Sequence, residues 1–389
     1  MVTATVQFCG AGGTSEAARQ VGIVVDAAIN HNTCAIRTHQ TNHPTALHIC
    51  QPMEECNPDE LPNSDMLLTS PCCTNHSVAK GQKRYHQLDL FGEIIYDPQS
   101  EKSRNTMDDV IRFAKSKHNM HTPYKFIIVE NVVDVIKWRC YQQWLTSMTT
   151  LDIPELQAPG AEPIYRYQVL YWNTQFFGIP QSRDRVYILF WLSSLPAPDL
   201  TFTPHGFCAQ CQREIAACQS WKRTKWGCYQ RQYDYRCPHC ARIVAPESLS
   251  IRAFLNMNDP GRTLGERKLS EKTRRKIAEG IRRMQGQPFL LGYYKNALYR
   301  RLDEPIGTVT TLDRWALVAP AASGSLNDCR MRMLSVPELK RCMGFPETYH
   351  VHGNAKEQVW MLGNAVCPPI MANILKRCLP VLTRAQKAA

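Results

Sequence analysis

Two pairs of cysteines have the spacing of a metal site. Cys208 and Cys211 form one Cys-x-x-Cys pair, and Cys237 and Cys240 form a second pair after 25 intervening residues. Each pair can place two thiolates about 2.3 Å from one tetrahedral Zn²⁺, which would close a zinc ribbon around the segment between them. Because four cysteines leave no coordination position for a substrate, the pattern predicts structural zinc. A redox dithiol and two unrelated pairs are the alternatives.

A second type of cysteine chemistry is possible near the start of the chain. Cys72 and Cys73 follow the apolar segment Met66–Thr69 and open a loop that soon becomes basic. An exposed thiolate close to positive charge is a candidate nucleophile, and a buried structural cysteine is the alternative.

Two further segments place polar groups or glycines directly after apolar runs. Glu130 and Asn131 end the run Phe126–Val129, where a carboxyl in a half-apolar pocket can act as an acid or hydrogen-bond donor. The alternative is a pair that caps a helix. The glycines of Phe8–Gly13 lie between a strand-like and a helix-like segment, where backbone amides can approach a ligand at the helix N-terminus. The alternative is a tight turn that binds no ligand.

The elements that must position these residues alternate between strand and helix. The expected strands are Thr5–Phe8, Ile23–Ala28, Met66–Thr69, Phe126–Val129 and Arg185–Trp191, with a helix over Ser15–Val21. Such alternation is typical of βαβ units on a parallel sheet, and ligands bind at the carboxyl ends of its strands. The sequence therefore predicts an α/β fold with a doubly wound sheet.

The character of the chain changes after Trp191. A linker-like run, Ser193–Pro198, precedes the paired cysteines and a basic region in which Ser270–Gln285 reads as a helix with Ser270 as its N-cap. Helices are also expected over Val336–Cys342 and Pro368–Leu379. We therefore expect the first part of a catalytic domain over 1–196, a smaller zinc-containing domain over 197–301, and a return to the catalytic domain over 302–389.

The positive charge is concentrated in one region. The chain has 46 Lys and Arg against 34 Asp and Glu, and residues 201–301 hold 20 of the former and only 7 of the latter. Clustered cations among aromatic residues are typical of a surface for nucleic acid, and a solvated basic surface is the alternative. The aromatic residues in question are Trp221, Trp226, Tyr229, Tyr233 and Tyr235.

The cellular compartment is inferred from the expected absence of a membrane span and of an export signal. Apolar runs such as Val186–Leu192 are strand-sized, so we expect no membrane span, and the first residues lack the pattern of an export signal. The 17 cysteines are then expected to be thiols or metal ligands rather than disulfides, in a cytoplasmic protein of a bacterium or a phage.

Taken in order along the chain, these segments resemble the cytosine-5 DNA methyltransferase family. The resemblance covers about residues 5–192 and 300–380. The matching segments are Phe8–Gly13, Ser70–Ser77, Glu130–Val132, Gly178–Arg185, Pro305–Thr311, Glu338–Pro346 and Gln358–Val366. The resemblance implies a Rossmann-like methyltransferase domain, S-adenosylmethionine as the methyl donor, double-stranded DNA as the partner, and a cytosine flipped out of the duplex.

The resemblance also implies roles for the catalytic candidates. Family spacing places the nucleophile four residues before the serine of its loop, which selects Cys73, with Cys72 as the alternative. Glu130 would bond the cytosine ring, and Arg185 would contact the flipped nucleotide. Asn131 would organise the loop, and Arg183 would contact either a loop or a phosphate.

Cofactor contacts follow from the same resemblance. They are expected at Phe8, Gly10, Gly12, Gly13, Asn30, Ile49, Asn364 and Val366. Two positions depart from the family pattern, because Asn30 stands where an acidic residue usually holds the ribose, and His48 stands where an aspartate usually contacts the adenine.

The resulting hypothesis is a DNA cytosine-5 methyltransferase with a zinc-bearing target-recognition domain, acting as a monomer. An RNA cytosine-5 methyltransferase and a catalytically inactive, zinc-dependent DNA-binding protein are the alternatives. The sequence leaves open the DNA target and whether the enzyme serves restriction-modification.

Overall fold

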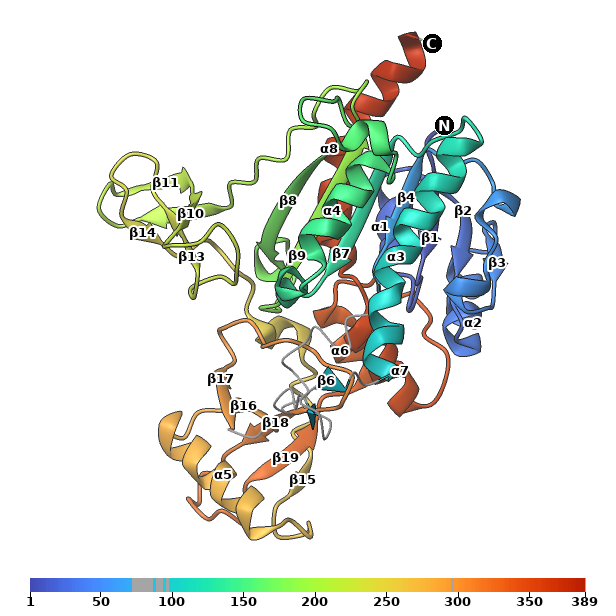
Figure 1. The fold of residues 1–389 in the computed structure, drawn as a ribbon. Coiled ribbons are helices and arrows are strands. Elements are labelled where there is room, and N and C mark those ends of the chain that lie inside the picture. Colours follow the sequence, from blue (N-terminus) through green and yellow to red (C-terminus); the bar gives the residue numbers. More distant parts are fainter. Residues whose placement is uncertain (72–86, 89–93, 96–97, 295–296, 389) are drawn as a thin grey trace.

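A seven-stranded sheet with the order β3-β2-β1-β4-β7-β9-β8 forms the centre of the molecule (Figure 1). The computed structural model describes residues 1–71, 87–88, 94–95, 98–294 and 297–388. The strands are β1 (Thr3–Gln7), β2 (Val24–Ile29), β3 (Leu47–Ile49), β4 (Met66–Thr69), β7 (Phe126–Asn131), β8 (Tyr165–Asn173) and β9 (Asp184–Leu192). The α/β prediction is confirmed.

One strand departs from the expected parallel arrangement. The first five strands in the sheet order run parallel, whereas β9 is antiparallel to both of its neighbours, β7 and β8. The connection from β8 to β9 spans only 174–183, and a parallel crossover needs a dozen residues or more. A direct antiparallel return is therefore the connection that this length allows.

Helices cover both faces of the sheet. Helices α1 (Gly13–Gln20), α2 (Thr33–Asn42) and α8 (Pro368–Ala388) share one hydrophobic core, and α3 (Pro98–Asn119) and α4 (Tyr141–Thr150) share the other. Strand residues alternate between these cores, since Met66 and Leu68 belong to the first and Leu67 to the second. Burial on both faces explains why the central strands read as unbroken apolar runs.

A five-stranded antiparallel sheet forms a second body (Figure 1). In spatial order it contains β15 (Arg262–Thr263), β19 (Arg330–Met333), β18 (Trp315–Ala319), β16 (Phe289–Gly292) and β17 (Leu298–Arg301). Helix α5 (Glu271–Arg283) packs Ile277 into the core of this sheet, and its expected N-cap is confirmed because the Ser270 side chain accepts from the Thr273 amide. The domain boundary expected at residue 302 therefore falls inside this sheet, because β15, β16 and β17 come before it and β18 and β19 come after it.

The paired cysteines lie in a third body, which we call the cysteine module (205–244). It contains β10 (His205–Cys208), β11 (Arg213–Ala216), β12 (Cys218–Trp221), β13 (Tyr233–Arg236) and β14 (Ile243–Val244). Buried Tyr233 and Tyr235 belong to the same core as β7 and β9, so the module is docked on the central sheet. The remaining elements are β5 (Gln87–Leu88), β6 (Ile94–Ile95), α6 (Val336–Cys342) and α7 (Ala355–Asn364).

One described segment bears on the expectation that no helix spans a membrane. Ala355–Arg384 is long and apolar enough, by length and composition, to cross a membrane. It comprises α7 and most of α8, and 67% of its most apolar window is buried inside the protein. The core helix of a globular fold passes the same test, and this burial agrees with that interpretation.

Candidate active site

The glycine turn packs tightly against the last part of the chain. Gly12 has a φ of 83° and caps α1, and a Cβ added there would overlap the Tyr349 hydroxyl. A Cβ at Gly13 would overlap the carbonyl oxygen of Val366. The Tyr349 hydroxyl also donates to the Ala11 carbonyl at 2.7 Å. Glycine at these two positions therefore allows the turn and the C-terminal segments to meet.

Most of the other expected cofactor residues lie at the same edge of the sheet. Phe8 follows β1, Asn30 follows β2, and the Asn30 amide donates to the Ile49 carbonyl at 3.1 Å. Among the described residues, an added Cβ at Gly10 would meet only the Phe8 carbonyl oxygen, at 3.7 Å, so that part of the protein leaves the turn open here. Asn364 is exposed at the end of α7.

This edge suits a ligand of the expected kind, with one difference in its polar groups. An open turn at a helix N-terminus lets backbone amides approach a ligand. The Asn30 Oδ1 already accepts from the Asn32 amide at 2.9 Å. A ribose hydroxyl would therefore accept from the Asn30 side-chain amide instead of donating to a carboxylate.

A chain of hydrogen-bonded polar side chains, buried at His39 and Ser15, lies beside this edge, and no local sequence pattern indicates it. His48 Nε2 is 2.8 Å from His39 Nδ1, and His39 Nε2 is 2.7 Å from Ser15 Oγ. Burial lowers the pKa of His39 well below its ordinary value and lowers that of His48. A neutral His39 can donate through one nitrogen and accept through the other, so it links His48 to α1.

Glu130 and Arg185 form a largely buried ion pair. Arg185 Nε lies 3.0 Å from Glu130 Oε1, and the two side chains are 14% and 8% exposed. Burial raises the pKa of Glu130, and the charges of Arg185 and Arg183 act against that rise. A carboxyl with a raised pKa can carry a proton to a bound ring.

Asn131 connects this pair to the expected nucleophile loop. Its Nδ2 lies 3.4 Å from the Pro71 carbonyl oxygen, and its Oδ1 accepts from the Val132 amide at 2.8 Å. Asn131 thus anchors the residue that precedes Cys72. Cys72 and Cys73 themselves lie outside the described residues.

Arg183, the first of the two arginines in the matching segment Gly178–Arg185, is a structural residue. Arg183 donates to the carbonyl oxygens of Val309, Gly363 and Ala365 at 2.9, 3.0 and 3.3 Å, and it is buried. Gln181 also binds Val309, accepting from its amide at 2.8 Å. Both Nη atoms of Arg183 therefore face buried backbone, which favours the expected loop contact over the expected phosphate contact.

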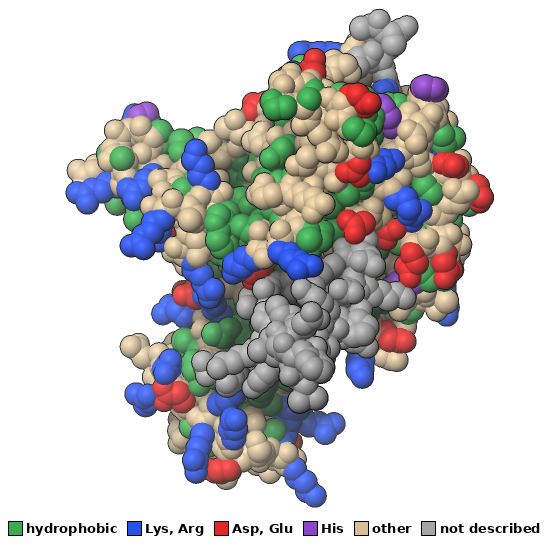
Figure 2. Space-filling model, viewed as in Figure 1, with side chains coloured by type: hydrophobic (Ala, Val, Ile, Leu, Met, Phe, Trp, Pro, Cys, Tyr) green, Lys and Arg blue, Asp and Glu red, His purple; other side chains and the backbone are tan. Residues whose placement is uncertain are grey.

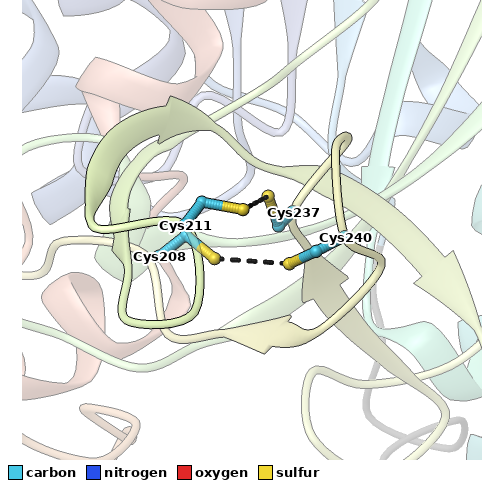
Figure 3. A group of neighbouring side chains, drawn as sticks. All are labelled: Cys208, Cys211, Cys237 and Cys240. Atoms are coloured by element: carbon cyan, nitrogen blue, oxygen red, sulfur yellow. Dashed lines mark hydrogen bonds between the residues drawn. The ribbon is translucent and has the colours of Figure 1, made fainter.

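The four cysteines converge as their spacing predicts (Figure 3). Cys208 Sγ is 3.5 Å from Cys240 Sγ, Cys211 Sγ is 3.9 Å from Cys237 Sγ, and all four sulfur atoms lie within 4.8 Å of one another. A tetrahedral zinc with Zn–S distances of about 2.3 Å separates its sulfur atoms by about 3.8 Å. The donor set and its dimensions therefore fit one zinc ion.

Two of the five aromatic residues expected at a nucleic-acid surface are buried instead, and a third packs against the central sheet. Tyr233 and Tyr235 are buried, and Trp221 packs edge-on against Tyr171 of β8, with 5.5 Å between ring centroids. Lys and Arg side chains, by contrast, gather on the face of the module and around α5 that Figure 2 shows. The basic charge reaches the surface, whereas these aromatics support the docking of the module.

Comparisons with known proteins agree with the geometry. Residues 7–380 match the C-5 cytosine-specific DNA methylase family. Type II methyltransferase M.FnuDI of Fusobacterium nucleatum is 21% identical over 98% of this chain and 95% of its own length. Type II methyltransferase M.AgeI of Thalassovita gelatinovora is 25% identical, but that alignment covers 46% of this chain and 37% of the relative.

Solved structures share the fold. A putative DNA modification methyltransferase encoded within an E. coli prophage has a TM-score of 0.58 at 14% identity, over 98% of this chain and 100% of the other. A Spodoptera frugiperda DNMT2 mutant has a TM-score of 0.56 at 16% identity, over 97% and 100%. With the family match extending over most of its length, this chain belongs to the C-5 cytosine-specific DNA methylase family.

Proposed function

We propose that this chain transfers a methyl group from S-adenosylmethionine to C5 of a cytosine in double-stranded DNA. The observation that carries the proposal is the buried Glu130–Arg185 pair at the carboxyl end of β7. Asn131, the next residue, binds Pro71 just before the expected nucleophile. Membership of the family adds the reaction type.

The side chains present suit the demands of this reaction. C5 of cytosine is a weak nucleophile until a group adds to C6, and the ring is accessible only when the base leaves the stack. Cys73 would form a bond to C6 as Glu130, held by Arg185, hydrogen-bonds N3 and the exocyclic amine. When bound, the methyl donor supplies the methyl group that C5 accepts. Loss of the C5 proton and breakage of the C6–S bond then restore the aromatic ring and the thiolate.

The methyl donor would bind at the open edge of the sheet. We assign its contacts to Phe8, Gly10, Gly12, Gly13, Asn30, Ile49, Asn364 and Val366. The tight packing of the glycine turn on the C-terminal segment supports this assignment, because it holds the two halves of the proposed site together.

We further propose that Cys208, Cys211, Cys237 and Cys240 hold one structural zinc ion. Residues 1–196 and 302–389 would supply the catalytic part and 197–301 the target-recognition part, whose basic surface would meet DNA phosphates. Strands β18 and β19 would be the exception, because they complete the sheet that β15, β16 and β17 begin. A zinc content near one ion per chain, measured by mass spectrometry of the purified protein, would support the metal proposal. A cytoplasmic location and a monomeric state remain predictions.

Tritium transfer from labelled S-adenosylmethionine tests the function. Duplex DNA should become labelled by the wild type but not by Glu130→Ala. Glu162→Ala is a matched control, because Glu162 is exposed and precedes the end of β8 that pairs with Leu192, whereas Arg185 pairs with Trp172 near the other end. Equal or greater labelling of RNA would favour the RNA methyltransferase. Tight DNA binding without binding of the methyl donor would favour the inactive DNA-binding protein.

A further inference from the structure

One of the contacts between the cysteine module and the central sheet is made by a carboxylate next to the proposed active site. The Tyr229 amide donates to Asp184 Oδ1 at 2.9 Å. Asn173 Nδ2, from the paired end of β8, donates to the same oxygen at 3.1 Å. Burial raises the pKa of Asp184, and these two donors oppose that rise. Asp184 is therefore held between a strand of the central sheet and a turn of the module.

Asp184 immediately precedes Arg185 on β9. Successive side chains of a strand point to opposite faces, so Asp184 faces the module while Arg185 reaches Glu130. Arg185 Nη1 also donates to the Asp184 carbonyl oxygen at 2.7 Å. The backbone position of Asp184 consequently sets the position of the guanidinium group that holds Glu130.

The turn that contacts Asp184 is itself firmly held. The Tyr229 ring packs edge-on against Phe176, with 4.9 Å between ring centroids. The Gln230 amide donates to the Tyr233 carbonyl at 2.7 Å, which ties the turn to β13. The residue that follows β13 is Cys237, one of the four cysteines. A continuous set of contacts thus runs from the cysteine cluster to the Asp184 carboxylate.

We propose that Asp184 is a positioning residue through which the cysteine module aligns the Arg185–Glu130 pair. The proposal rests on the proposed function for its catalytic consequence, but the structural link does not depend on methyl transfer. It gives the module a task besides contacting DNA: it supports the strand end that holds the reacting carboxyl group. A displacement of about 1 Å in such a group can reduce a rate about a hundredfold.

Three variants separate positioning from general stability. Asp184→Ala removes the acceptor, whereas Asp184→Asn keeps an oxygen that can still accept from the Tyr229 amide. Asp234→Asn is the matched control, because Asp234 is a buried carboxylate of the same module that pairs with Lys222 at 3.0 Å. We expect Asp184→Ala to lower kcat at least about tenfold with KM for DNA and methyl donor within about twofold of wild type.

The same kinetic series contains the outcomes that decide the proposal. Asp184→Asn should recover most of the lost kcat, and Asp234→Asn should retain wild-type kcat. The proposal is overturned if Asp184→Ala keeps its kcat, if it changes KM alone, or if Asp184→Asn is as slow as Asp184→Ala.

Hydrogen exchange measures the link without an activity assay or a variant. Removing the metal from the wild type with a chelator should accelerate amide exchange at the start of β9 (Asp184–Tyr187), while β1 (Thr3–Gln7) keeps its protection. Faster exchange confined to 205–244 would overturn the link. If the wild type transfers no methyl group but β9 still responds to metal removal, the proposed function fails and the link stands.

Discussion

Replacing Arg183 by methionine should destabilise the protein strongly although the residue lies in a segment expected to meet DNA. Methionine fills the space of the aliphatic stem but cannot donate to the three carbonyl oxygens of Val309, Gly363 and Ala365. Those residues are buried, so water cannot easily replace the lost donors. The variant thus loses the hydrogen bonds that tie the residue before β9 to two C-terminal segments.

The expected loss follows from these contacts. An unsatisfied buried acceptor costs about 1–3 kcal/mol, and part of that cost is offset because the desolvation penalty of a buried guanidinium also disappears. For three acceptors we expect the free energy of unfolding to fall by about 3–5 kcal/mol. Arg166→Met is the control, because Arg166 is 55% exposed and pairs with Glu162, which is also exposed, so we predict a loss of about 0–1 kcal/mol.

Urea unfolding followed by circular dichroism measures the difference in the free energy of unfolding between each variant and the wild type. The first transition is compared, because a chain of this size need not unfold in one step. The salt dependence of DNA binding provides a second readout, since a phosphate contact contributes about one unit to the slope of log K against log salt. We expect the Arg183→Met slope to equal that of the wild type. A stability loss below about 1 kcal/mol, or a slope reduced by about one unit, would refute the structural role.

Three further substitutions test other parts of the account. In Gly13→Ala the added Cβ overlaps a backbone carbonyl, so calorimetry should show that the methyl donor binds about tenfold or more weakly. Gly265→Ala is the control, because its Cβ meets no described atom closer than 3.5 Å and the variant should bind the methyl donor with wild-type affinity. Equal affinities for the two variants would contradict the assignment of Gly13 to the methyl-donor site. Glu338→Ala breaks a buried ion pair and should lower the free energy of unfolding by about 3–5 kcal/mol at pH 7. Burial alone would raise the pKa of Glu338, but hydrogen bonds from its arginine partner and from backbone amides lower that pKa below 4.5. The stability that Glu338 adds is therefore present above pH 4.5 and is lost as the pH falls through the pKa of Glu338 in the folded protein. A stability difference between wild type and Glu338→Ala that stays constant at acid pH would argue against this. Burial raises the pKa of Glu130 above 4.5, so methyl transfer should slow as rising pH removes the proton of this carboxyl group. Glu130→Gln should be about 10²- to 10⁴-fold slower than the wild type, and its rate should no longer fall with rising pH. If the rate of Glu130→Gln still falls in the same way, Glu130 is not the titrating group.

The central strands were predictable because both of their faces are buried. The expected strand Met66–Thr69 has the same bounds as β4, and its residues alternate between the two cores. β8 was not predicted, although it is longer. It lies at the edge of the sheet and exposes Arg166, Tyr167 and Gln168, so it lacks the apolar run by which the other strands were recognised.

The aromatic residues of the basic region show the limit of composition. Tyr233 and Tyr235 lie two apart on β13, so they share one face of the strand, and that face is buried. The same residues on an exposed face would have the same composition. Only the packing of the module on Phe176 and Tyr171 distinguishes a docking surface from a nucleic-acid surface.

Contacts between distant segments were beyond sequence reasoning. The pair Glu130 and Arg185 was expected to take part in catalysis, but the ion pair between them depends on β7 and β9 being neighbours. The contact between Asp184 and Tyr229 likewise joins residues 45 positions apart. Neither partner has a local pattern that indicates the other.

Bisulfite sequencing of DNA from a methylation-free bacterial host that expresses the protein tests the central claim most directly. We predict 5-methylcytosine at a defined sequence for the wild type and for Cys72→Ala, and none for Cys73→Ala or Glu130→Ala. A mark lost only in Cys72→Ala would move the nucleophile by one residue. An unmarked genome with the folded wild-type protein present would contradict the proposal that this chain methylates cytosine in DNA.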